Sequence, residues 1–110
     1  MPSRFSTIEA AVAAIRDGRV VIVVDAEDRE NEGDFVCAAE RATPATVNFM
    51  ITYGRGQLCM PILPEVSQRL ALHPMVERNT APLGTNYTVP VDHRSTRTGI
   101  TAAERARTIQ

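Results

Sequence analysis

Residues 20–39 read VVIVVDAEDRENEGDFVCAA, and this stretch sets the expected fold. The run 20–24 is entirely β-branched, and such a run without polar alternation is typical of a strand covered on both faces. The apolar run 35–38 predicts a second, short strand. Between the two runs, residues 25–34 hold six of the chain's thirteen acidic side chains and one arginine. Because carboxylates repel one another, this acidic loop must face water, a basic partner or a metal ion.

The composition excludes several classes of partner. A chain of 110 residues is one domain or part of one, and its 44% apolar and 23% charged residues are those of a globular protein. The net charge of −1 and the aromatic content of 5% indicate no nucleic-acid partner. No apolar run approaches the ~20 residues of a membrane helix, so we expect no membrane contact. The cysteines, Cys37 and Cys59, lack Cys-x-x-Cys spacing, which favours reduced thiols in a cytoplasmic protein.

Two further absences limit the chemistry of the chain. All twelve basic residues are arginine, so a lysine Schiff base is excluded for this chain alone. The two histidines, His73 and His93, do not stand in a metal-ligand spacing, so no zinc site is expected.

The remaining sequence alternates helical and extended patterns. Capping boxes at 6–9 and 101–104 and the pair Thr43-Pro44 mark helix starts. We expect helices over about Thr7–Asp17, from Thr43 to Tyr53, over Pro64–Leu70 and from Thr101 onward, with further strands at 58–60 and 87–89. The predicted fold is therefore α/β of layered type, with helices packed on a central mixed sheet and the acidic loop at a strand end. The last helix has a start signal and no stop signal, so we expect a truncated single domain.

The acidic loop has the pattern of a metal site. Glu30, Glu32 and Asp34 are spaced by two, and in an extended segment their side chains point to one side. Three carboxylates make a hard-oxygen site suited to Mg²⁺ or Mn²⁺, and a carboxylate left free can act as a general base. Arg29 can hold an anionic substrate. The alternative is a solvated acidic turn, since charge runs usually solvate.

The same residues do not fit an EF-hand loop. With Asp28 as its first position, the twelfth position is Ala39, where a bidentate glutamate is required. A divalent ion beside a carboxylate base instead suits removal of a proton next to a carbonyl group. The residues therefore predict chemistry on a hydroxy-ketone or a hydroxy acid without choosing between them.

The signature at 25–34 resembles that of 3,4-dihydroxy-2-butanone 4-phosphate synthase, an enzyme of riboflavin biosynthesis. The resemblance continues in order along nearly the whole chain, through the segments 38–40, 56–59, 79–80, 84–85 and 98–102. It implies a lyase that converts D-ribulose 5-phosphate to 3,4-dihydroxy-2-butanone 4-phosphate and formate with Mg²⁺, through enediol intermediates. It also implies a homodimer, and some family members are fused to GTP cyclohydrolase II.

The resemblance also implies residue roles. Glu30 is the expected metal ligand, and the expected substrate contacts are Arg29, Glu30, Asp34 and Thr98. The expected catalytic residues are Glu32, Asp34 and Cys59. Without the resemblance, Cys59 reads as a core residue and Thr98 as a turn residue. Glu104 departs from the aspartate usual in the family but keeps the capping box.

Family members are longer than this chain, and their second metal ligand is a histidine in a Gly-His-Thr segment that is absent here. We therefore expect the 110-residue chain alone to bind Mg²⁺ weakly and to be inactive. Two alternatives stay open. One is a non-catalytic truncated module that binds a sugar phosphate or a protein partner. The other is a metal-binding acidic loop on a structural domain.

Overall fold

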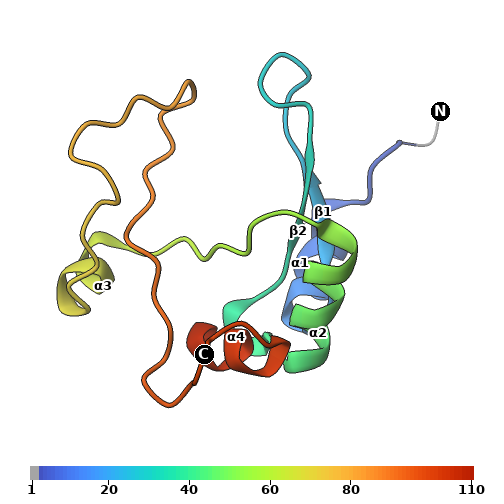
Figure 1. The fold of residues 1–110 in the computed structure, drawn as a ribbon. Coiled ribbons are helices and arrows are strands. Elements are labelled where there is room, and N and C mark those ends of the chain that lie inside the picture. The colour runs from blue at the N-terminus through green and yellow to red at the C-terminus, as the bar shows by residue number, and fades with distance from the viewer. Residues whose placement is uncertain (1–2) are drawn as a thin grey trace.

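The structure is a computed structural model and describes residues 3–110. Its elements are α1 (Ile8–Arg16), β1 (Val21–Val24), β2 (Gly33–Val36), η1 (Ala39–Arg41), α2 (Pro44–Phe49), η2 (Met50–Gly54), α3 (Pro64–Arg69) and α4 (Ala102–Ile109). Figure 1 shows the hairpin of β1 and β2 beside α1 and α2, with α4 beneath them. The mixed α/β class is confirmed. Over the described range, no helix is both long and apolar enough to cross a membrane.

The caps of the helices agree with the sequence in two of three cases. Thr43 accepts a hydrogen bond from the amide of Thr46, and Thr101 accepts one from the amide of Glu104. At α1 the cap is Thr7, which accepts from the amide of Ala10, so the expected cap at Ser6 is wrong by one residue. Thr7 has the extended backbone of a cap, and the helix begins one residue later than the box pattern indicates.

The sheet of the described residues is a single antiparallel pair. Val21 pairs with Val36 and Val24 pairs with Gly33, and the acidic loop joins the two strands. The expected strand at 58–60 is absent from residues 3–110, because this extended segment has no strand beside it to supply hydrogen bonds. The expected strand at 87–89 is reduced to one bridge between Pro74 and Thr88. Two hydrogen bonds close this bridge, from the amide of Met75 to the carbonyl oxygen of Tyr87 and from the amide of Val89 to the carbonyl oxygen of His73.

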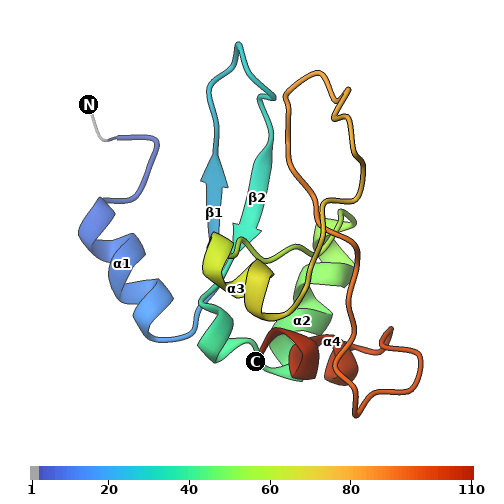
Figure 2. The ribbon, with the colours of Figure 1, turned by 90° about the vertical axis from the view of Figure 1, so that its left-hand side faces the viewer.

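The hairpin is only partly covered. The Phe35 ring of β2 packs on Phe49 with ring centroids 5.3 Å apart, and Phe49 packs on Tyr53. Ile22, which pairs with Phe35 on that face, is nonetheless 66% exposed, and Val23 on the other face is 51% exposed. The expectation of a strand covered on both faces is therefore wrong for the described chain. Figure 2 shows the reason: the hairpin extends beyond the helices, and α1 stands to one side of it.

The core is small and lies between α2 and α4. Ala42, Val47 and Ala106 are its buried members, and Cys37 is among the half-buried residues that pack around them. The chain exposes 9323 Å². A compact protein of this mass exposes about 6,000 Å². The excess area means that much of the apolar surface in residues 3–110 has no partner within that range.

Candidate active site

The acidic loop is held in a tight turn by the carboxylate of Asp25. Its Oδ2 accepts a hydrogen bond from the amide of Glu30 at 2.9 Å, and its Oδ1 accepts one from the amide of Glu32 at 3.0 Å. These two backbone hydrogen bonds are the main reason that the pKa of Asp25 is lowered. Asn31 completes the turn with a left-handed backbone at φ 53°. Asp25 therefore fixes the loop from the end of β1.

Arg29 lies inside this loop between two carboxylates. Its Nη1 donates to Asp25 Oδ2 at 3.0 Å and also contacts the carboxylate of Glu30. The hydrogen bond to Asp25 is the largest cause of the raised pKa of the Arg29 guanidinium. The Arg29 side chain is still 52% exposed, so part of its planar set of donors faces solvent. A guanidinium fixed in this way can bind an anionic group with little loss of side-chain freedom.

The three carboxylates expected on one side do not gather there. Residues 27–30 form a turn, so the alternation that would align Glu30 with Glu32 and Asp34 is broken before β2 begins. Within residues 3–110, no three side chains of histidine, cysteine, aspartate or glutamate are grouped to hold a metal ion. The one-sided trio is therefore wrong as geometry. These carboxylates provide the hard oxygens that Mg²⁺ prefers, but too few of them lie close together to complete a site.

Glu32 and Asp34 lie instead at an open hollow of about 360 Å³ beside β2. The opposite wall comes from η2 and the segment 56–58. An added Cβ at Gly54 would lie 3.2 Å from the Phe35 ring, so η2 approaches β2 closely. Cys59 follows this wall directly and is exposed, so it does not occupy the core position that a pattern of apolar neighbours indicates. The structure therefore brings two predicted site residues to one hollow and a third next to it in the chain.

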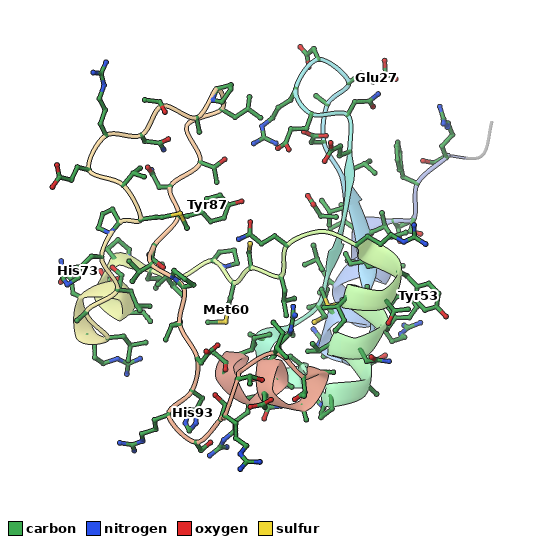
Figure 3. The ribbon with its side chains drawn as sticks, in the orientation of Figure 1. Glu27, Tyr53, Met60, His73, Tyr87 and His93 are labelled. Atoms are coloured by element: carbon green, nitrogen blue, oxygen red, sulfur yellow. The ribbon has the colours of Figure 1, made fainter. Side chains whose placement is uncertain are left out.

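Thr98 lies far from the acidic loop in the described structure. It is exposed in the loop that precedes α4, between Arg97 and the buried Gly99. Figure 3 labels Glu27 of the acidic loop and His93 of the loop before α4, and the two lie at opposite ends of the molecule. The views in Figures 1 and 2 agree on this separation. The structure does not bring Thr98 together with Glu30 or Asp34.

Two residues organise these loops in ways that the sequence pattern does not predict. Asp25 is one of six acidic residues in the pattern, although an aspartate directly after a strand is a common acceptor for turn amides. Glu104 fits the capping box at 101–104, but its carboxylate also accepts hydrogen bonds from the amides of Arg97 and Gly99. No local pattern announces that second role, because it depends on how the preceding loop folds back.

Comparison with known proteins places the chain in a family. The sequence model of the family described as 3,4-dihydroxy-2-butanone 4-phosphate synthase matches residues 9–110. The riboflavin biosynthesis protein RibBA of Bacillus subtilis (strain 168) is 58% identical over 106 residues, which is 96% of this chain and 27% of that protein. The RibBA protein of Bacillus mycoides is 57% identical over the same length and the same shares of both chains. The chain therefore spans about a quarter of the curated relatives it matches.

Solved structures agree in fold. A 3,4-dihydroxy-2-butanone 4-phosphate synthase in complex with two magnesium ions superposes with a TM-score of 0.89 at 42% identity, covering 96% of this chain and 50% of that one. RibBX, a two-domain synthase from A. baumannii, gives a TM-score of 0.84 at 49% identity, covering 96% of this chain and 31% of that one. With a family match over nearly its full length, the chain belongs to the 3,4-dihydroxy-2-butanone 4-phosphate synthase family.

Proposed function

We propose that the chain is the N-terminal part of a lyase that converts D-ribulose 5-phosphate to 3,4-dihydroxy-2-butanone 4-phosphate and formate in riboflavin biosynthesis. The observation that carries the proposal is the acidic loop in a chain of this family: a guanidinium held between two carboxylates beside a hollow lined by two more. A sugar phosphate brings both anionic oxygens and a carbonyl with acidic neighbouring C–H bonds. The loop offers a cation for the first and proton acceptors for the second.

The ion pairs divide the roles among the carboxylates. Glu30 is paired with Arg29, so its negative charge is partly compensated. Glu32 and Asp34 make no ion pair within residues 3–110, and both lie at the hollow. They are the residues we assign to proton transfer. Arg29 is assigned to an oxygen of the substrate, and Cys59 to the lining of the same site. Thr98 lies far from the acidic loop within this chain, so its assignment to the substrate site depends on the proposed homodimer bringing it to the acidic loop of a second copy.

A divalent ion, Mg²⁺ or Mn²⁺, is part of the proposal, with Glu30 as its ligand from this chain. A bound divalent ion stabilises negative charge that develops on a substrate oxygen. Support comes from the matched synthase that is in complex with two magnesium ions. Because the described residues bring no three donors together, a complete ion site needs ligands outside this group.

The oligomeric state and the compartment remain proposals from the family resemblance. We propose a homodimer and a cytoplasmic location for the whole protein. The cysteines are consistent with a reducing compartment, since Cys37 and Cys59 are both free.

The function is tested in a chimera in which this chain replaces the 106 matched residues of the Bacillus subtilis relative. Formate release from D-ribulose 5-phosphate with Mg²⁺ is the readout. We expect the chimera to be active and Glu30→Gln to lower its rate by about a hundredfold or more. Loss of a residue that only supports a metal ligand already lowers activity by about 10- to 100-fold, and loss of the ligand itself should lower it further. Glu27→Gln, in the same loop, is the matched control and should keep the parent rate. A folded chimera that releases no formate would instead favour a module that only binds. An active chimera that tolerates Glu30→Gln would overturn the metal-ligand role of Glu30 alone.

A further inference from the structure

The loop that carries Thr98 is fastened to helix α4 by a single carboxylate oxygen. Glu104 Oε2 accepts hydrogen bonds from the amide of Arg97 at 2.7 Å and from the amide of Gly99 at 3.1 Å. These are the two amides on either side of Thr98. The other oxygen, Oε1, accepts from the hydroxyl of Thr101 at 2.9 Å. Glu104 thus holds the backbone on both sides of Thr98.

The same helix supplies two further contacts to this loop. Arg105 Nε donates to the carbonyl oxygen of Ile100 at 2.7 Å, and Thr108 Oγ1 accepts from the amide of His93 at 3.0 Å. The helix is itself fixed to the core, because Ala106 is 2% exposed. The loop is therefore hydrogen-bonded to the packed helix α4 at its beginning, middle and end.

The Thr98 side chain is left free by this arrangement. It is exposed, and among the hydrogen bonds of residues 3–110 its hydroxyl makes none. Gly99 has a left-handed backbone at φ +72°, which directs the chain sharply after Thr98. A backbone fixed on both sides of an unbonded hydroxyl is the arrangement expected of a residue that presents its side chain to a ligand.

We propose that Glu104 is a positioning residue for Thr98, whose backbone it holds so that the threonine hydroxyl enters the synthase site in one orientation. The inference rests on the proposed function, in which Thr98 contacts substrate. A carboxylate suits the task because one charged oxygen can accept from two amides at once, and charge-assisted hydrogen bonds are stronger than neutral ones. Hydrogen bonding to the two amides lowers the pKa of Glu104, as expected when bonds favour the charged form.

The first experiment measures the geometry on the 110-residue chain by NMR. The amide protons of Arg97 and Gly99 should shift together as the pH falls, with a midpoint below the ordinary value of 4.5 for glutamate. The other titratable groups near the loop are Asp92, His93 and the nearby arginines, so the assignment needs a variant. Glu104→Gln should remove the joint shift. Glu9→Gln, in the first turn of α1, should leave it intact. Amides that titrate independently, or that still titrate in Glu104→Gln, overturn the proposal.

The second experiment measures the consequence in the active chimera. Glu104→Gln should lower kcat/KM by about tenfold, the value of one lost charge-assisted bond, while Glu9→Gln keeps the parent constants. The enzyme concentration used for kcat is corrected for the folded fraction measured by circular dichroism. A purely structural role of Glu104 would change that fraction but leave KM and the corrected kcat unchanged. Glu104→Asp keeps the charge and should stay within about threefold of the parent, and it decides the question if Glu104→Gln does not fold.

The outcomes separate the two hypotheses. Glu104→Gln constants equal to those of Glu9→Gln overturn the positioning role while the proposed function stands. Glu104→Asp as poor as Glu104→Gln also overturns it, since the carboxylate would then not be the cause. A chimera that is inactive with every residue intact removes the proposed function and the role of Glu104 with it.

Discussion

Gly99 provides the sharpest test of the packing of the loop that carries Thr98. Its backbone is left-handed at φ +72°, and an added Cβ would lie 2.2 Å from Oδ1 and 2.3 Å from Cγ of Asp92. Gly84 has nearly the same backbone, at φ +68°, with no atom within 4 Å of an added Cβ. The two positions therefore share a conformational penalty and differ in one contact.

The expected losses of unfolding free energy follow from this difference. The left-handed conformation costs an L-residue about 1–2 kcal/mol, which is all that Gly84→Ala should lose. Forcing Asp92 away adds about 1–3 kcal/mol, so Gly99→Ala should lose about 2–5 kcal/mol in total. The double variant Asp92→Ala/Gly99→Ala removes the three clashing atoms and should return to the loss seen at Gly84.

Urea unfolding followed by circular dichroism measures all four chains, and amide exchange at residues 97–101 reports the loop itself. If Gly84→Ala folds and Gly99→Ala does not, the Gly99→Ala substitution costs more than the whole free energy of unfolding of the parent chain. Equal losses at the two glycines, or no recovery on adding Asp92→Ala, would refute the close contact between Gly99 and Asp92.

Three further predictions address the loop, the core and the thiols. The pKa of Asp25 is lowered by its hydrogen bonds to the loop amides, so the loop should stay ordered through the ordinary value of 3.8 and open only as the pH falls through the lowered pKa. The amide chemical shifts of Glu30 and Glu32 measure this opening, and a midpoint at or above 3.8 would contradict it. Val47 of α2 is fully buried, so Val47→Ala should lower the free energy of unfolding by about 2–3 kcal/mol. Ile8 is 74% exposed, so Ile8→Ala should change it by less than about 0.5 kcal/mol. Equal losses of the two variants in urea unfolding would exclude the assigned core. Burial raises the pKa of the Cys37 thiol, so an alkylating reagent at pH 7 should modify the exposed Cys59 first, and mass spectrometry that finds Cys37 modified first would be inconsistent with the structure.

The parts of the fold that could be predicted are those set by neighbouring residues. The β-branched run and the acidic loop predict the hairpin of β1 and β2, and the caps at Thr43 and Thr101 predict the starts of α2 and α4. The strands expected at 58–60 and 87–89 depend on partners elsewhere in the chain, which local propensity cannot supply. The cover expected over the run 20–24 is likewise a non-local property.

The candidate site divides in the same way. The pattern of charges locates the loop and its residues, but Glu30 aligns with Glu32 only if the backbone between them is extended. The carboxylate of Asp25 bends the loop by bonding to amides, and a count of charges does not reveal which carboxylate will do so. The hollow that unites Glu32 and Asp34 with η2 needs the fold, as does the hold of Glu104 on the loop of Thr98.

The most direct test of the account is formate release from D-ribulose 5-phosphate with Mg²⁺, measured side by side for the isolated 110-residue chain and for its chimera with the Bacillus subtilis relative. We expect formate release from the chimera and none from the isolated chain above a metal-free control, because the described residues hold part of the site but group no three metal donors. Formate from the isolated chain would contradict the claim that its site is partial, and a folded but silent chimera would contradict the claim that this chain supplies part of a synthase site.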